Sequence, residues 1–218
     1  MSDNVTLSNV NVEGNIRTAF EIRDCKNVKI NNVYINSNYT GGIESNLIGI
    51  YNAENVSIEG GSFKGSSGFL IYGEVTKNIY INNVHMDLTF RVMELESRNL
   101  ENTPFTGGEI SNIVFNNLDI YLTKQSSHDG PLIFIREYDT NPVSDIYFKN
   151  VKLYLNNLYP YGVVRIRDVN RILFENASFT LLGSRTDTQI IVVGGDSSLT
   201  LVRPLFDGIR ERDVQIVD

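Results

Sequence analysis

A nine-residue pattern recurs along this chain and constrains its fold more than any other feature. Each copy reads as one polar residue, an apolar-x-apolar triplet, two turn residues and a second apolar-x-apolar triplet. Eight copies are present, the last much degraded: 4–12, 27–35, 55–63, 78–86, 112–120, 145–153, 171–179 and 198–206. Their starting positions differ by 23 to 34 residues, so the unit is constant while its connections vary. A unit repeated at this interval is typical of a solenoid.

The alternation within each copy predicts two short strands, each with one buried face, that meet at a corner. The second turn residue at this corner is asparagine in most copies and glycine in one. These positions are Asn9, Asn32, Gly60, Asn83, Asn117, Asn150 and Asn176. Because Asn and Gly accept positive φ most readily, the column predicts a left-handed bend once per repeat, with asparagine side chains hydrogen-bonded along it.

A third strand is expected between the copies, where a four-residue register recurs with apolar residues at its first and third positions. It occurs at 20–23, 48–51, 69–72, 93–96, 133–136, 164–167 and 191–194. Three one-faced strands cannot form a compact unit alone, but stacked repeats bury their inward residues in continuous columns. The sequence therefore predicts an all-β fold: a right-handed parallel β-helix of about eight coils with three strands per coil, forming one domain over residues 1–218.

Two other parallel repeats were weighed against this prediction. A left-handed β-helix would show hexapeptide periodicity, and a leucine-rich repeat would show helix-forming stretches between strands. The sequence shows neither feature.

The pattern from residue 4 to about residue 206 resembles the pectin-lyase-like superfamily of right-handed parallel β-helices, which includes pectate lyases, polygalacturonases and phage tailspikes. An amphipathic helix usually caps the first coil in that superfamily, whereas here the strand pattern begins at Val5 and the chain closes on the strand-like segment 213–218. Open coil ends attract other strands. We therefore expect a fragment of a longer protein whose ends are covered by neighbouring domains, or a homotrimer like the tailspikes it resembles.

The second and fourth residues of the four-residue strands should point outward, and chemistry-bearing residues gather there in the middle coils. The candidate catalytic residues are Glu94, Glu96, Arg136 and Arg165, and the candidate substrate-binding residues are Tyr51, Tyr72, Phe134 and Arg167, with His128 and Asp129 from a neighbouring loop. The longest insertions, at 97–111, 123–131 and 137–144, flank this region and would wall a groove. For His128 and Asp129 a plain Asp-Gly turn is the alternative reading.

A sugar polymer suits such a groove, since aromatic rings can stack on pyranose faces. Three neighbouring arginines favour an anionic glycan, through bidentate hydrogen bonds to its carboxylates. The alternative is a solvated charge ladder between coils formed by Glu96, Arg136 and Arg167, which would contribute little stability.

Catalysis is a further hypothesis for the same residues. Glu94 and Glu96 lie two residues apart on one strand, so their separation of roughly 6.6–7 Å fits an inverting glycosidase, although any two outward neighbours have this spacing. The resemblance to pectate lyases implies an Arg or Lys base with carboxylates for calcium, and Arg136 or Arg165 beside Glu94 and Glu96 could be arranged in this way. The polygalacturonase signatures Asp-Asp, Gly-His-Gly and Arg-Ile-Lys are absent, and residues 165–167 match the last of them only in part. The aspartate-rich calcium signature of pectate lyases is absent as well. No catalytic residue can therefore be carried over from those families.

Composition limits which cofactors and partners the protein can have. Cys25 is the only cysteine, so neither an internal disulfide nor a cysteine-based metal site can form, and no metal or cofactor is implied. The net charge is −7 with both signs interspersed, which disfavours a nucleic-acid partner. No apolar run approaches the roughly 20 residues that span a bilayer, so no membrane partner is expected.

These observations favour a carbohydrate-recognition β-helix of a phage tail fibre, tailspike or similar surface-attachment protein, with a polysaccharide as its partner and an extracellular or virion-associated location. A polysaccharide lyase or glycoside hydrolase with an atypical active site is the alternative, and a structural spacer is the third reading.

Overall fold

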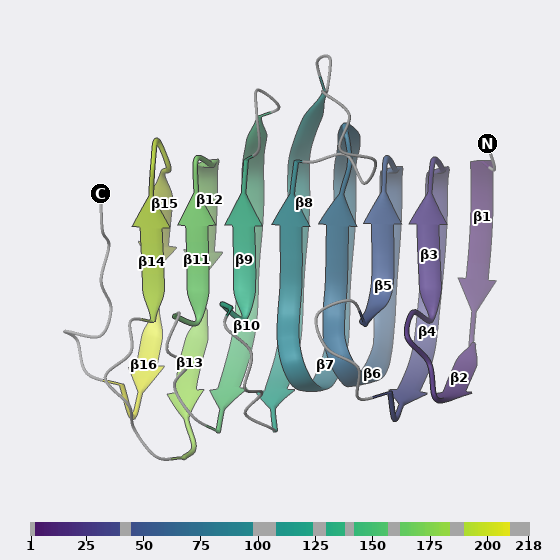
Figure 1. Ribbon diagram of the computed structural model, residues 1–218, viewed down its shortest axis with the longest axis horizontal. Coiled ribbons are helices and arrows are strands. Elements are labelled where there is room, and N and C mark those ends of the chain that lie inside the picture. Colours follow the sequence, from purple (N-terminus) through teal and green to yellow (C-terminus); the bar gives the residue numbers. More distant parts are fainter. Residues whose placement is uncertain are drawn as a thin grey trace.

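The computed structural model describes residues 3–39, 45–97, 108–123, 130–137, 142–156, 162–183 and 190–209. These residues form strands and connecting turns, with no helix among them, and all strand pairs are parallel. In Figure 1 the strands at the front run upward while successive coils are added from right to left, which makes the winding right-handed. The predicted right-handed parallel β-helix is confirmed.

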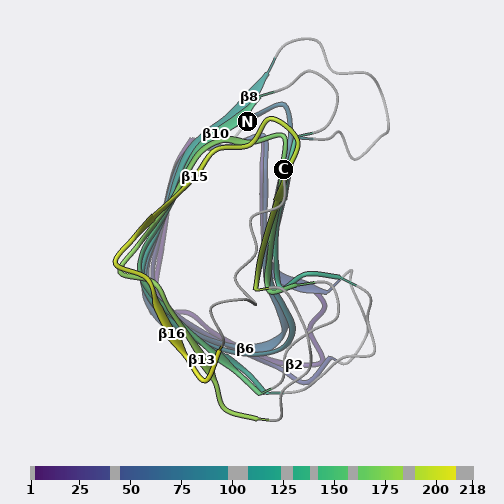
Figure 2. The same ribbon diagram turned by 90° about the vertical axis from the view of Figure 1, so that its left-hand side faces the viewer.

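Each coil has three faces, and Figure 2 shows successive coils superimposed on a three-sided outline. The first sheet contains one strand from each of the eight repeats, in chain order. Its members are β1 (Asp3–Ser8), β4 (Lys26–Ser37), β6 (Glu54–Tyr72), β7 (Val75–Glu96), β8 (Glu109–Leu122), β10 (Val143–Leu155), β12 (Asn170–Glu175) and β15 (Leu199–Val202).

The longer strands bend around the corners and so belong to more than one face. The second sheet joins the later parts of β4, β6, β7, β8 and β10 to β2 (Asn11–Gly14), β13 (Ser178–Leu181) and β16 (Leu205–Asp207). The third sheet joins the ends of β6 and β7 to β3 (Phe20–Arg23), β5 (Asn46–Tyr51), β9 (Ile133–Arg136), β11 (Val164–Arg167) and β14 (Ile191–Gly194).

The register of the third sheet is the one that the sequence predicts. One inward column runs through seven strands, and all its members are buried: Ile22, Ile50, Ile71, Leu95, Ile135, Ile166 and Val193. Inside the prism, aromatic rings stack between coils, with centroids 5.0 Å apart for Phe115 and Phe148 and 4.4 Å apart for Phe148 and Phe174. Apolar burial in continuous columns therefore holds the coils together.

The predicted asparagine column at the first corner is also present. Its residues all have positive φ, from Asn9 at 57° through Gly60 at 71° to Asn176 at 52°. Side-chain amides donate from one coil to the next, for example Asn117 to Asn83 at 3.1 Å and Asn150 to Asn117 at 3.2 Å. The same left-handed bend is thus repeated and tied together along the molecule.

A second column of positive φ, which the sequence analysis did not single out, lies at the polar residue that begins each of the first seven repeats. Its asparagine ladder links Asn27 to Asn4 and continues to Asn112, which donates to Asn78 at 2.8 Å. In the next coils the column changes to Asp145 and Arg171, which keep φ values of 57° and 55°. The bend survives this change of residue type because tertiary stacking holds it.

Candidate functional site

The predicted site residues on the third sheet do line up on neighbouring strands. Tyr51, Tyr72, Glu96, Arg136 and Arg167 are successive register partners. The adjoining column brings Glu94, Phe134 and Arg165 together in the same way. The alignment expected from the sequence is therefore correct, but the two halves of this face differ in exposure.

In the N-terminal half of the face, the part over β5, β6 and β7 is largely buried, whereas β3 is exposed. Tyr72 is 3% exposed, Glu94 8% and Glu96 0%, and Tyr51 lies edge-on to Tyr72 with ring centroids 6.3 Å apart. Burial, reinforced by the nearby Glu21 carboxylate, raises the pKa of Tyr51 above its usual value. The expectation of an open groove lined by Tyr51, Tyr72, Glu94 and Glu96 is therefore wrong, because alternation shows on which side of a sheet a residue lies but not whether that side is covered.

Each candidate catalytic carboxylate in this half is bound by an arginine. Glu94 pairs with Arg91 three residues earlier, and both side chains are at least nine-tenths buried. Glu96 accepts a hydrogen bond from Nε of Arg136 on the next strand. A glycosidase carboxylate must reach the sugar, and these two are directed at protein cations instead. Catalysis by Glu94, Glu96, Arg136 and Arg165 stays a prediction that no contact in the structure favours.

The alternative charge ladder is present only in part. Arg136 and Glu96 form one rung, but Glu96 is buried rather than solvated. Arg167 pairs within its own turn, its Nε lying 3.2 Å from Oδ2 of Asp168. Arg167 therefore pairs with Asp168 and does not continue the ladder formed by Glu96 and Arg136.

The C-terminal half of the face is open and positively charged. Arg165 and Arg167 are exposed on β11. Phe134 is half-buried beside Arg165, and the guanidinium of Arg136 lies 4.7 Å from its ring centroid. Arg165 has no ion-pair or hydrogen-bond partner in the part of the chain that the structure describes. We call Phe134, Arg136, Arg165 and Arg167 the arginine face.

His128 and Asp129 lie outside the described residues, as do most of the insertions expected to wall the groove. The alternative reading of an Asp-Gly turn at 129–130 also stays a prediction.

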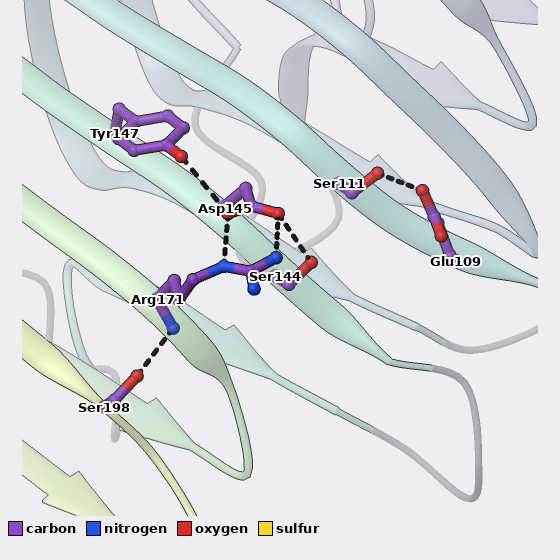
Figure 3. A network of polar contacts seen from close by, with 7 residues as sticks. All are labelled: Glu109, Ser111, Ser144, Asp145, Tyr147, Arg171 and Ser198. Carbon is purple, nitrogen blue, oxygen red and sulfur yellow. Dashed lines mark hydrogen bonds and ion pairs between the residues drawn. The ribbon is translucent and has the colours of Figure 1, made fainter.

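A second polar cluster lies where the second asparagine ladder changes character (Figure 3). Asp145 accepts hydrogen bonds from both Nε and a terminal nitrogen of Arg171, the first at 2.6 Å, and from the hydroxyls of Ser144 and Tyr147. The hydrogen bond from Arg171 is the main reason why the pKa of Asp145 lies below its usual value. Every lone pair direction is used within the corner, so this cluster fastens two coils together.

Sequence reasoning missed an aromatic row on the outer face of the second sheet. The rings of Tyr121 and Tyr154 stack with centroids 4.3 Å apart, and His85 lies 5.4 Å from Tyr121. His85 is exposed on the same face. The same alternation that located the arginine face could have located this row, had the second triplet of each repeat been read for its outward residues.

Two further surveys of the described residues bear on the kind of site. No group of three or more His, Cys, Asp or Glu side chains is placed to hold a metal ion in these ranges. Nor does this part of the chain contain a helix with the length and apolar character needed to cross a bilayer.

Fold and surface together define the class of the molecule as a right-handed parallel β-helix with a solvent-exposed arginine face. Comparison with protein-family models, with curated proteins and with solved structures found no match.

Proposed function

We propose that this protein binds an acidic polysaccharide through the arginine face, as a surface-attachment β-helix of the phage tail-fibre or tailspike kind. The observation that carries the proposal is Arg165, which is exposed, has no partner among the described residues and lies beside the half-buried ring of Phe134. A guanidinium presents donors in a planar fork that matches a carboxylate, and an adjacent ring offers a surface for a pyranose.

The charge distribution supports an anionic ligand. The whole chain carries a net charge of −7, yet three arginines share two neighbouring strands here. Glu96 and Asp168 each engage one of them, which leaves Arg165 available. The backbone of Arg165 is already fixed in a strand, so binding has to order only its side chain, which favours recognition.

The shape of the face supports a polymer over a small molecule. Parallel strands about 4.8 Å apart offer equivalent positions along the solenoid axis, so a repeating ligand can contact several coils. Burial of the outward residues on β5, β6 and β7 separates the arginine face from the exposed end at β3, so a polymer on this face would contact β9, β11 and β14.

Calorimetric titration with polygalacturonate and alginate tests the proposal. We expect saturable binding that weakens as NaCl rises from about 50 mM to about 200 mM, because ion pairing is screened. Arg165→Ala should lower the affinity about tenfold. Arg23→Ala is the matched control, since Arg23 lies on the same sheet five strands away and already pairs with Glu21.

Measuring reducing ends and unsaturated products in the same samples separates attachment from cleavage. Binding without products supports the proposal, whereas products that disappear in Glu94→Gln or Glu96→Gln would replace it with the enzyme alternative. Absence of binding to both polymers, or equal affinities of the native protein and Arg165→Ala, would contradict the arginine face as the site.

A further inference from the structure

The aromatic row on the second sheet consists of rings that face along the solenoid axis. Tyr121 and Tyr154 are register partners on β8 and β10, their planes differ by 10° and their centroids are 4.3 Å apart. That spacing is close to the roughly 4.8 Å between neighbouring strands. Each ring is therefore stacked against the ring of the neighbouring coil, and an outermost ring presents its free face to the next coil.

The row ends at a threonine. Thr180 on β13 is the register partner of Tyr154, and both residues are half-buried. A threonine side chain covers much less of a ring than another tyrosine would. The outer part of the Tyr154 ring is thus left with a flat apolar surface above Thr180, in the place that a further aromatic ring would occupy.

A cavity of about 130 Å³ lies beside the other end of the row, where β4, β6, β7 and β8 end their second-sheet segments. Asn38, Lys64, Asp87, Thr89 and Thr123 are among the residues that line it. Asp87 is the register partner of Tyr121, so the cavity and the rings form one continuous surface.

The cavity contains a carboxylate oxygen that needs a donor. Oδ1 of Asp87 is buried and has no hydrogen-bond partner, and a buried acceptor left in that state costs free energy. Lys64, whose ammonium only donates, lines the same cavity and forms no ion pair among the described residues. A ligand hydroxyl can donate to Asp87 and accept from Lys64, whereas a metal ion would be repelled by the ammonium.

Between β6 and β10 the charges on this face balance. Lys64 offsets Asp87, and Nζ of Lys152 lies 3.2 Å from Oδ1 of Asp119 in the adjoining column. The Asp119 carboxylate is the main reason why the pKa of Lys152 lies above its usual value. Glu13 and Asp207 add negative charge at the two ends, so this face does not attract an acidic polymer, in contrast to the arginine face.

We propose that the outer face of the second sheet is a separate binding site for a neutral oligosaccharide lying along the solenoid axis. Hydroxyls of one sugar unit enter the cavity at Asp87 and Lys64, and a later unit stacks on Tyr154 above Thr180. The strands of Lys64 and Thr180 are four strand spacings apart, so the site spans about 19 Å. It lies on a different sheet from the arginine face and takes a different class of glycan.

Calorimetric titration of the full chain with cellohexaose, maltohexaose and chitohexaose tests this site. We expect saturable binding of at least one hexasaccharide. Asp87→Asn and Tyr154→Ala should each lower that affinity about tenfold, since each removes one of the two anchoring contacts. Tyr80→Ala, which removes an exposed tyrosine from the first sheet, is the matched control and should have no effect.

Thr180→Tyr sharpens the test without deleting any packing. The new ring would continue the stack into the space that we assign to the sugar, so this variant should bind the hexasaccharide at least about tenfold more weakly. Arg165→Ala should leave hexasaccharide affinity unchanged, which separates this site from the arginine face.

The proposal is overturned if none of the three hexasaccharides binds, or if Asp87→Asn and Thr180→Tyr both retain native affinity while their urea midpoints show that they are folded. Failure of polygalacturonate binding, in contrast, would leave this site intact.

Discussion

The two halves of the third sheet's outer face both carry charged and aromatic residues, but these residues differ in exposure and pairing. In the N-terminal half, Glu94 and Glu96 are buried and bound by arginines. In the C-terminal half, Arg165 and Arg167 are exposed, and Arg165 has no partner in the described chain. The difference teaches that an outward position in a β-helix becomes a binding residue only where its charge is left uncompensated and accessible.

Among these substitutions, Glu96→Ala should cause the largest change in the free energy of unfolding. Removing this buried carboxylate breaks its ion pair with the three-quarters-buried Arg136, so the free energy of unfolding should fall by about 2–3 kcal/mol in urea denaturation. Arg165→Ala, in the other half, should change it by less than about 0.5 kcal/mol. Equal effects of the two substitutions would abolish the distinction.

Asn117→Ala tests whether the asparagine column at the first corner stabilises the fold. Asn117 has a φ of 52° and donates to Asn83, so alanine should lose about 2 kcal/mol through the left-handed strain and the missing hydrogen bonds. Asn117→Gly should lose less, because glycine accepts this φ without strain. If both variants were as stable as the native protein, the ladder would contribute nothing.

Asp145→Asn compares a partly exposed charged pair with the more deeply buried pair at Glu96. The pKa of Asp145 is lowered in the folded state, chiefly by the hydrogen bond from Arg171, so its contribution is present above the unfolded-state pKa and is lost as the pH falls through the folded-state pKa. At pH 7 the substitution should cost about 1 kcal/mol, and near pH 2 the difference should shrink. Urea titrations at both pH values measure it.

Asp207→Asn is the control for that experiment, since Asp207 is exposed on β16 and makes no ion pair in the described ranges. Its free energy of unfolding should match the native protein at both pH values. If Asp145→Asn lowered the free energy of unfolding equally at both pH values, the ion pair would not be the source of the loss.

Arg167→Ala should have the smallest effect. Its guanidinium is shared with Asp168, so we expect only a two- to threefold loss of affinity for polygalacturonate, about 0.5 kcal/mol. A loss as large as that of Arg165→Ala would indicate that the Asp168 contact opens on binding.

Most of the fold could be predicted from the sequence because inward residues repeat with the period of the strand. Ile22, Ile50, Ile135 and Ile166 lie in one buried column, as the four-residue register requires. The asparagine corner was predictable for a related reason, since few residues accept a positive φ.

The state of the outer face could not be predicted in the same way. Whether Glu96 is covered and which arginine reaches it depend on segments distant in sequence, which alternation does not report. The cavity beside Asp87 was equally hidden, because it is lined by residues from β4 to β8 together with the chain that follows them.

Thiol labelling of single-cysteine variants tests the central distinction most directly. In a Cys25→Ser background, a charged thiol reagent would be applied to Arg165→Cys, Ile166→Cys and Tyr72→Cys, and the labelling rates compared under native conditions. The account predicts fast labelling at 165 and protection at both 166 and 72 until the protein unfolds. Equal rates at 72 and 165 would contradict it.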